Sequence, residues 1–325
     1  MDQGIIVAIK ERLSVAQNIF VISHVRPDGD AVGSLLAFGL ALQEAGKKVQ
    51  MLLADGVPSS FRHLPGSGQI RKSADGTFDL IVTLDCADLK RVGRVLDGYR
   101  VGAAHGKPDI NIDHHITNEL FGALNLIEPD AVATSSILFR HLPEWGYMIT
   151  RPVAANLVTG IVTDTLGFRT TNTTPESLRQ VAALMELGVD MTDLYYRGLV
   201  RRSFPAARYW AAGLSSLQRA DGIVWGTMTL ADRKNADYPG NDDADLINVI
   251  SSIEDCDITM IFVEQTHGSV KISWRTQTPE LDVSQIAKQF GGGGHPGAAG
   301  ADVTGTLAEV QESVLAATRR ALYSR

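Results

Sequence analysis

Cysteine is scarce in this chain of 325 residues, which contains only two, Cys86 and Cys256. They lie far apart and match no zinc-site spacing, which indicates a reducing compartment. Long apolar runs are also missing, since none approaches the length of a membrane-spanning helix. The first residues reach Lys10, Glu11 and Arg12 before any such run, unlike a signal peptide. We therefore expect a cytoplasmic protein with no membrane partner.

An excess of basic residues is lacking as well. The 30 Lys and Arg residues are outnumbered by 37 Asp and Glu, which gives a net charge of −7 and a pI of about 5.6. This balance argues against a broad basic surface for long duplex nucleic acid. It still permits a small anionic substrate held by metal ions and a few arginines. At roughly 150 residues per domain, the length predicts about two globular domains.

One short loop, residues 23–34, concentrates polar side chains between a strand-like and a helix-like run. It contains His24, Asp28 and Asp30, and its Pro27 and Gly29 favour a tight turn that could bring the three together. Two carboxylates so close repel each other unless a cation lies between them. The loop is therefore either a divalent metal site or an Asp-rich turn that caps the next helix, with His24 as an ordinary strand-end residue.

Strands and helices alternate along the first part of the chain. Strands are predicted at 18–23, 48–53, 79–84, 109–112 and 123–127, and helices at 4–16, after the loop to about residue 45, and at 134–142, 152–164, 175–187 and 191–200. This alternation predicts an α/β fold in which a mainly parallel sheet is flanked by helices. We assign this N-terminal domain to residues 1–194.

The pattern restarts after a connecting segment. We expect a linker helix at 195–210 and a smaller α/β domain at 211–325, with the active site in the cleft between the two domains. Strands are predicted here at 214–219, 222–230, 257–264 and 268–275, and helices at 243–253, 283–290 and 306–323.

Three later segments add acids and histidines to the loop. Asp85 ends an apolar strand, His114 and His115 follow an acid at another strand end, and Asp164 ends an apolar helix. Asp85 could alternatively cap the structure that follows it. Together with the loop, these residues form a mixed imidazole and carboxylate set suited to Mn²⁺ or a similar ion. Two such ions about 3.5–4 Å apart could share one carboxylate, bind a water and clamp a phosphoryl oxygen.

The order of these motifs resembles that of the DHH phosphoesterase superfamily. The resemblance rests on His-x-x-Pro-Asp-Gly-Asp-Ala-x-Gly-Ser from His24, on Asp85, on Asp113-His114-His115 and on Thr163-Asp164. Residues 291–300, Gly-Gly-Gly-Gly-His-Pro-Gly-Ala-Ala-Gly, resemble the signature of the DHH-associated C-terminal domain. The match covers nearly the whole chain. The short two-domain layout is most similar to the bifunctional oligoribonuclease and pAp phosphatase group, the nanoRNases.

The resemblance implies two divalent metal ions, foremost Mn²⁺, with two ligand sets and one shared acid. The ligands are His24 and Asp28 for one ion, Asp30, His114 and Asp164 for the other, and Asp85 for both. Besides Asp85, the implied catalytic residue is His115, which would contact the scissile phosphate and serve as an acid. Asp113 would orient a ligand histidine from behind, as metal-bound imidazoles usually require.

Substrate contacts are expected from both domains. Arg275, at the end of a predicted strand, offers a bidentate fork for phosphate, although a solvated surface arginine is the alternative. Gly293, Gly294 and His295 belong to a glycine-rich loop whose backbone N–H groups could face an anion, with a flexible linker as the alternative. Arg169 follows Asp164 closely and could face the substrate.

These features predict a Mn²⁺-dependent phosphoesterase. It would hydrolyse short single-stranded oligonucleotides (nanoRNA) to mononucleotides, and dephosphorylate pAp, by attack of a metal-activated water on phosphorus. A few phosphates neutralised by metals and arginines suit an acidic protein. The alternatives are a linear or cyclic dinucleotide phosphodiesterase, a pyrophosphatase or exopolyphosphatase, and a non-catalytic nucleotide-binding regulator. A homodimer is a further open expectation.

Overall fold

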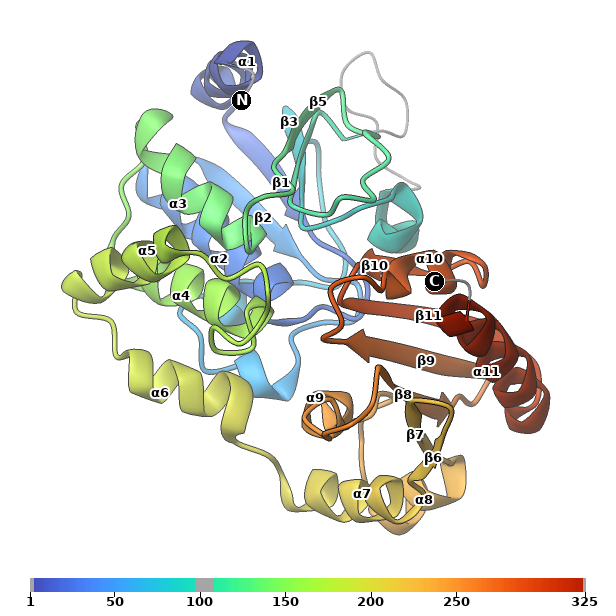
Figure 1. Ribbon diagram of the computed structural model, residues 1–325. Coiled ribbons are helices and arrows are strands. Elements are labelled where there is room, and N and C mark those ends of the chain that lie inside the picture. Colours follow the sequence, from blue (N-terminus) through green and yellow to red (C-terminus); the bar gives the residue numbers. More distant parts are fainter. Residues whose placement is uncertain (1–2, 97–107, 324–325) are drawn as a thin grey trace. The chain divides into compact units, whose positions relative to one another are not determined.

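The computed structural model describes residues 3–96 and 108–323, and it divides the chain into two compact units, Met1–Arg201 and Arg202–Arg325 (Figure 1). The division falls inside the segment 195–210, for which a linker helix is predicted. That segment is a π-helical turn, Tyr196–Val200, followed by the first part of helix α7, Phe204–Ser215.

The first unit is built on a five-stranded parallel sheet, which confirms the predicted α/β class. Its spatial order is β2-β1-β3-β4-β5. The strands are β1 (Asn18–Ile22), β2 (Lys48–Leu52), β3 (Leu80–Leu84), β4 (Ile110–Asp113) and β5 (Leu124–Ile127). All residues of β3 and β4 are buried. This complete burial is typical of a parallel sheet, in which both faces are covered.

Helices gather on one face of this sheet, and shorter elements cover the other. The helices are α1 (Gln3–Val15), α2 (Gly29–Glu44), α3 (Thr134–Glu144), α4 (Arg151–Asp164), α5 (Pro175–Glu186) and α6 (Met191–Tyr195). Residues of α1 to α4 share one apolar core with alternate residues of the strands, including Ile19 and Val21. Phe20 and Ile22 point to the opposite face, where the 3₁₀ helix Leu89–Leu96 packs. Two further 3₁₀ helices span Ser59–Phe61 and Ser67–Gln69.

The strand order positions the chemistry-bearing loops. The chain leaves β1 toward β2 on one side and later adds β3 on the other side of β1. In such a sheet the crevice for ligands opens beyond the carboxyl ends of the strands, where the order reverses. The loop after β1 and the residue after β3 are therefore neighbours at this switch point.

Two residues of the loop after β1, Asp28 and Gly33, have structural roles at the start of α2. The Asp28 side chain accepts hydrogen bonds from the backbone N–H groups of Asp30 and Ala31 and so caps α2. Gly33 faces α4, and a Cβ at Gly33 would lie 2.5 Å from the Asn156 carbonyl oxygen. The helix-cap interpretation of the loop is thus correct for Asp28, and Gly33 permits close packing of two helices.

The second unit holds a six-stranded mixed sheet in the order β10-β11-β9-β8-β7-β6, in which only β7 and β8 pair in parallel among the described residues. The strands are β6 (Gln218–Ala220), β7 (Ile223–Met228), β8 (Ile258–Glu264), β9 (Ser269–Thr276), β10 (Gly293–His295) and β11 (Ala298–Thr304). The helices besides α7 are α8 (Leu230–Asn235), α9 (Leu246–Ile250), α10 (Val283–Lys288) and α11 (Leu307–Tyr323). Its largest core is centred on Trp274, which is fully buried.

Three predicted elements of the second unit were wrong in extent. The strand predicted at 214–219 is the end of α7 followed by the short β6. The helix predicted at 243–253 is reduced to α9, because Ala244 and Asp245 adopt positive φ values of 53° and 65°. The strand predicted at 222–230 ends at Met228, because the Thr229 side chain caps α8. Local caps and turns override apolar runs at these places.

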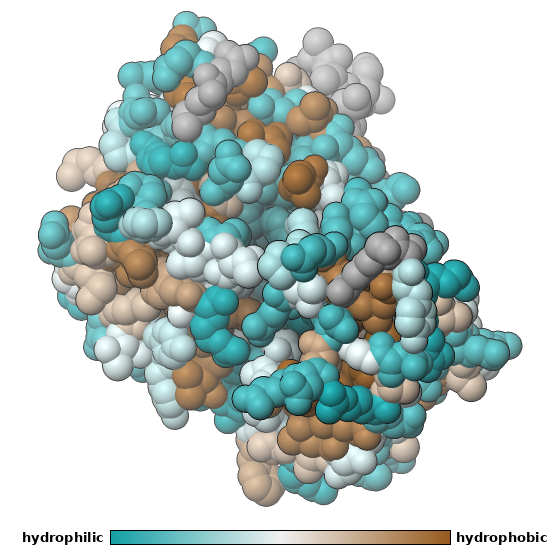
Figure 2. Space-filling view, viewed as in Figure 1, coloured by the Kyte–Doolittle hydropathy of each residue, from teal (hydrophilic) through white to brown (hydrophobic). Residues whose placement is uncertain are grey.

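Among residues 3–96 and 108–323, no helix is long and apolar enough to cross a membrane. On the face shown in Figure 2, hydrophobic residues are interspersed with hydrophilic ones.

Candidate metal centre

The loop after β1 directs one imidazole nitrogen of His24 toward the carboxylates. His24 Nδ1 lies 2.8 Å from the Val25 carbonyl oxygen, and a carbonyl can only accept, so Nδ1 carries the proton. Nε2, the nitrogen left for a metal ion, lies 3.8 Å from Asp28 Oδ2 and 3.5 Å from Asp85 Oδ2. Asp28 is 60% exposed, whereas His24 is almost fully buried.

Asp85 occupies the end of β3 in a left-handed conformation, with φ of 56°. This backbone is uncommon for a residue with a side chain, and such conformations cluster at active sites. Its two carboxylate oxygens face two different imidazoles. Asp85 Oδ2 lies 3.5 Å from His24 Nε2, and Oδ1 lies 3.5 Å from His114 Nε2. Asp85 thus stands between two groups of polar side chains.

The second group consists of Asp30, His114 and Asp164. One potential ligand atom from each lies within 4.8 Å of the others, and the same holds for the group His24, Asp28 and Asp85. His114 Nε2 is 3.4 Å from Asp164 Oδ2, while its Nδ1 lies 3.2 Å from the Ala131 carbonyl oxygen. As in His24, a backbone carbonyl fixes the proton on Nδ1 and leaves Nε2 facing carboxylates.

Asp30 is held by the N-terminus of α3. The backbone N–H of Thr134 donates to Asp30 Oδ2 at 2.6 Å, and the backbone N–H and hydroxyl of Ser135 donate to Oδ1 at 3.0 and 2.6 Å. Gly160 makes room for this arrangement, because a Cβ there would lie 2.5 Å from Asp30 Oδ1. Thr134, Ser135 and Gly160 are not among the site residues predicted from the sequence. The run Thr134-Ser135 at a predicted helix start was the available signal, but its partner lies 104 residues away.

Asp113 contacts a different histidine from the one expected. Its Oδ1 lies 2.7 Å from His115 Nδ1 and accepts a hydrogen bond from the backbone N–H of His114 at 2.9 Å. The expectation was that Asp113 orients a ligand histidine, but the ring of His114 is oriented by Ala131. Asn118 Nδ2 donates to Asp113 Oδ2 at 2.6 Å, so Asp113 is itself fixed. His115 is 13% exposed, more than His114.

The electrostatics of the centre follow from burying many acids together. Burial and the charge of Asp85 raise the pKa of Asp30 to about 7. Burial and the charge of Asp30 raise the pKa of Asp164 well above its ordinary value. Burial opposes ionisation of Asp85 too, but hydrogen bonding to His24 and the charges of His115 and His24 lower its pKa.

The two histidines of the DHH motif respond in the opposite way. Burial alone would lower the pKa of His114, but the charges of Asp85 and Asp30 raise it. Burial would likewise lower the pKa of His115, but the charge and hydrogen bond of Asp113 raise it. The surrounding acids therefore favour the cationic forms of His114 and His115.

These donors fit divalent ions. Two imidazole Nε2 atoms lie 3.4–3.8 Å from carboxylate oxygens. In the neutral rings their lone pairs would repel these oxygens, and a cation between them turns the repulsion into coordination. Imidazole mixed with carboxylates is a ligand set for Mn²⁺ and similar metals. The structure brings together all six residues predicted as ligands, and their coordination of metal stays a prediction.

The residues predicted to contact substrate are placed in both units. Arg275 on β9 is paired with Ala298, which is paired in turn with His295 on β10. Directly paired residues share a face of a sheet, so Arg275 and His295 flank the small Ala298 side chain on one face. Gly294, with φ of 142°, has no space for a Cβ, which would lie 2.4 Å from the Ala298 carbonyl oxygen. The loop is therefore an ordered strand rather than a flexible linker.

Gly293 also belongs to β10, and nothing lies within 4 Å of the position of its missing Cβ. Arg169 lies in the first unit, exposed in the turn that follows α4.

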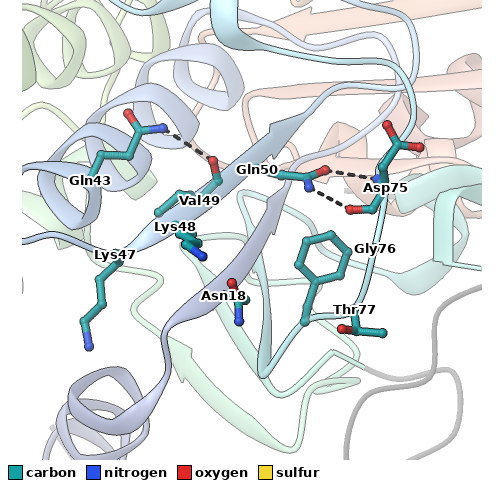
Figure 3. A pocket seen from close by; sticks show the side chains of 10 residues that line it. Asn18, Gln43, Lys47, Lys48, Val49, Gln50, Asp75, Gly76 and Thr77 are labelled. Atoms are coloured by element: carbon teal, nitrogen blue, oxygen red, sulfur yellow. Dashed lines mark hydrogen bonds between the residues drawn. The ribbon is translucent and has the colours of Figure 1, made fainter.

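A pocket of about 500 Å³ lies elsewhere in the first unit (Figure 3). It includes Asn18 and Lys48, the first residues of β1 and β2, and so opens at the amino ends of the strands. The candidate centre lies at their carboxyl ends. Gln50 in this pocket exchanges hydrogen bonds with the backbone of Asp75, in both directions. Its lining includes none of the predicted site residues.

Family models match both parts of the chain. The model of the DHH family, N-terminal domain, matches residues 18–161, and that of the DHHA1 domain matches residues 233–323. The bifunctional oligoribonuclease and PAP phosphatase NrnA of Thermus thermophilus is 34% identical over 310 residues, covering 94% of this chain and 90% of that protein. The Bacillus subtilis protein of the same name is 22% identical, covering 90% of this chain and 91% of its own.

A solved structure resembles the whole chain. An exopolyphosphatase-related protein from Bacteroides fragilis superimposes with a TM-score of 0.83 at 26% identity, covering 99% of this chain and 96% of that one. Fold, centre and relatives define a metal-dependent phosphoester hydrolase. The chain belongs to the DHH family, and its second unit carries the DHHA1 domain.

Proposed function

We propose that this chain uses two divalent metal ions to hydrolyse short oligonucleotides to mononucleotides and to remove the 3′-phosphate of pAp. The observation that carries the proposal is the position of Asp85, whose two oxygens each lie 3.5 Å from a different imidazole. A carboxylate so placed is suited to bridge two ions. Relatives that match most of the chain are named bifunctional oligoribonuclease and PAP phosphatase, which supports this substrate class.

In this proposal the two groups around Asp85 hold one ion each. His24 and Asp28 serve one ion, and Asp30, His114 and Asp164 serve the other. When bound, such a pair of ions supplies a hydroxide at neutral pH and neutralises charge on the phosphoryl oxygens. We favour Mn²⁺ because of the mixed imidazole and carboxylate set.

His115 is the proposed acid. Asp113 lies 2.7 Å from its Nδ1, and although burial lowers the pKa of His115, the charge and hydrogen bond of Asp113 raise it and so favour the protonated ring. Its partial exposure lets it reach the leaving oxygen of a substrate, whereas His114 is buried. A protonated imidazole can donate to that oxygen as the bond to phosphorus breaks.

The second unit is proposed to bind the substrate's phosphates. Arg275 and His295 lie on one face of the sheet, two strands apart, and neighbouring strands are about 4.8 Å apart. The backbones of Arg275 and His295 are thus roughly 10 Å apart, and a guanidinium and an imidazole on one face of the sheet suit the phosphates of a short strand. The exposed Arg169 is a further proposed contact. A short substrate needs only a few such contacts, which an acidic protein can supply, whereas a long duplex would need many.

The test is a substrate panel on purified protein. It comprises pAp, di- to pentanucleotides, cyclic dinucleotides, pyrophosphate and polyphosphate, each with MnCl₂ and with chelator. We expect Mn²⁺-dependent mononucleotide release from the shortest oligonucleotides, lost in Asp85→Ala and kept in Asp130→Ala, an exposed acid outside the centre. Faster hydrolysis of pyrophosphate, polyphosphate or cyclic dinucleotides than of short oligonucleotides and pAp would show that the proposed substrate class is wrong. Activity retained by Asp85→Ala would refute the bridging role.

Cytoplasmic location and a homodimer also stay predictions, tested by fractionation and by sedimentation.

A further inference from the structure

The segment Ala131–Ser135, which leads into α3, contacts residues of both candidate ligand groups. The Ala131 carbonyl oxygen faces His114 Nδ1 at 3.2 Å. The Thr134 hydroxyl donates to Asp85 Oδ1 at 3.2 Å, while its backbone N–H donates to Asp30. Ser135 differs from Thr134, since both its backbone N–H and its hydroxyl donate to Asp30.

We propose that Ser135 is a positioning residue that sets the affinity of the group Asp30, His114 and Asp164 for its divalent ion. The inference rests on the proposed metal centre and adds a residue that acts through Asp30. It predicts that loss of the Ser135 hydroxyl weakens one ion and spares the other.

The geometry explains why this hydroxyl matters. Asp30 lies on α2, whereas all three of its donors come from the start of α3, so the carboxylate is fixed between two helices. The short hydroxyl contact, 2.6 Å, sets the rotation of the carboxylate together with the Thr134 N–H on the other oxygen. Gly160 closes the remaining side, because a Cβ there would lie 2.0 Å from Ser135 Oγ. Only one orientation of Asp30 satisfies these contacts.

The expected size of the effect follows from metalloproteins in general. Mutating a residue that orients a metal ligand typically costs about 10–100-fold in metal affinity. In Ser135→Ala the two backbone donors remain, one on each oxygen, so Asp30 stays in place but loses the shorter of the two hydrogen bonds to Oδ1 and is held less firmly. We therefore expect a loss of about 10-fold in the affinity of one ion.

Ser136 provides a matched control. It follows Ser135 on α3, is also buried, and donates its own hydroxyl hydrogen bond at 2.6 Å, but to Gln180 Oε1. Ser135→Ala and Ser136→Ala each remove one buried hydroxyl from the same turn. A general loss of stability should affect both equally, whereas an effect through Asp30 should appear only in Ser135→Ala.

The experiment titrates Mn²⁺ into full-length protein by electron paramagnetic resonance and calorimetry. We expect two ions in the wild type, one of them bound about 10-fold more weakly in Ser135→Ala and both unchanged in Ser136→Ala. Thermal unfolding in chelator checks that both variants fold. Ser135→Cys, which keeps a weak donor, should lie between wild type and Ser135→Ala.

Equal affinities in the two alanine variants overturn the inference, as does equal weakening of both ions in Ser135→Ala. If the wild type binds no Mn²⁺ at all, the metal centre itself fails, which is a separate result from failure of the Ser135 role.

Discussion

Replacing Asp164 by Asn should stabilise the metal-free protein while it abolishes stabilisation by metal. Asp164 is 26% exposed and lies with Asp30 and His114 in a group whose ligand atoms are within 4.8 Å of one another. Two carboxylates at 4.8 Å repel by about 3 kcal/mol at an effective dielectric constant of 20. Asn keeps the shape of the side chain and removes this repulsion.

The pH dependence follows from the raised pKa of Asp164, which is caused by burial and then by the charge of Asp30. An acid whose pKa is raised in the folded protein opposes folding when it ionises. The metal-free wild type should therefore lose stability as pH rises from the ordinary carboxyl pKa of 3.8 through the raised value, and Asp164→Asn should lose less, because only the raised pKa of Asp30 then remains. The advantage of the variant should be greater at pH 8.5 than at pH 5.

The assay is thermal unfolding in chelator and in MnCl₂, at both pH values. A gain of 1–3 kcal/mol corresponds to a rise in Tm of roughly 2–4 °C per kcal/mol for a unit of this size. Metal should raise the Tm of the wild type and have little effect on the variant. Asp130→Asn, at an exposed acid, is the control. An unchanged or lower Tm of Asp164→Asn in chelator at pH 8.5 would refute the reasoning.

Other predictions concern the frame of the centre and the second unit. Burial lowers the pKa of His141, but hydrogen bonds to Glu128 and Glu144 outweigh it and raise the pKa above the ordinary value of 6.5. The charged ring therefore contributes its full stabilisation below pH 6.5, and this contribution is lost as pH rises through the pKa of the folded state. His141→Gln should thus cost about 1.5–3 kcal/mol by denaturant unfolding at pH 6 and less at pH 9. Gly160→Ala should lower stability by about 1–3 kcal/mol and weaken metal binding, because its Cβ would overlap Asp30. Arg275→Ala should raise KM for oligonucleotides at unchanged Mn²⁺ affinity.

Each of these has a contrary result. Equal losses at pH 6 and pH 9 would exclude a charged His141. Stabilisation of Gly160→Ala by about 0.4–1 kcal/mol, the usual gain for an unstrained Gly to Ala change, would show that the helix has room there. An unchanged KM in Arg275→Ala would remove this residue from the phosphate site, and Arg179→Ala, at an exposed arginine of α5, is its control.

The sequence predicted the first unit well because its signals are local. The strands of the parallel sheet are short segments rich in Ile, Leu and Val, Asp85 and His114 directly follow strands, and Asp164 ends a helix. His24 and Asp85 could be assigned to one edge because parallel strands present their carboxyl ends together. The caps and turns of the second unit were harder, since positive φ at Ala244 and Asp245 has no clear pattern in the residues.

Contacts between distant segments could not be predicted from local patterns. Asp30 and the start of α3 are 104 residues apart, and no local pattern in either segment indicates that they are in contact. The resemblance implied that Asp113 orients a ligand histidine. In the structure Asp113 contacts the ring of His115, and the Ala131 carbonyl contacts the ring of His114. Such pairings depend on how α2, α3 and β4 pack, which is decided by the whole core.

The most direct test of the central claim counts the ions and measures their coupling. We predict that wild-type protein binds two Mn²⁺ ions whose paramagnetic resonance signals are magnetically coupled, because the two oxygens of Asp85 face the two ligand groups. Asp85→Asn should lose the coupled signal and the hydrolysis of dinucleotides together. Two coupled ions and normal hydrolysis in Asp85→Asn would contradict the account.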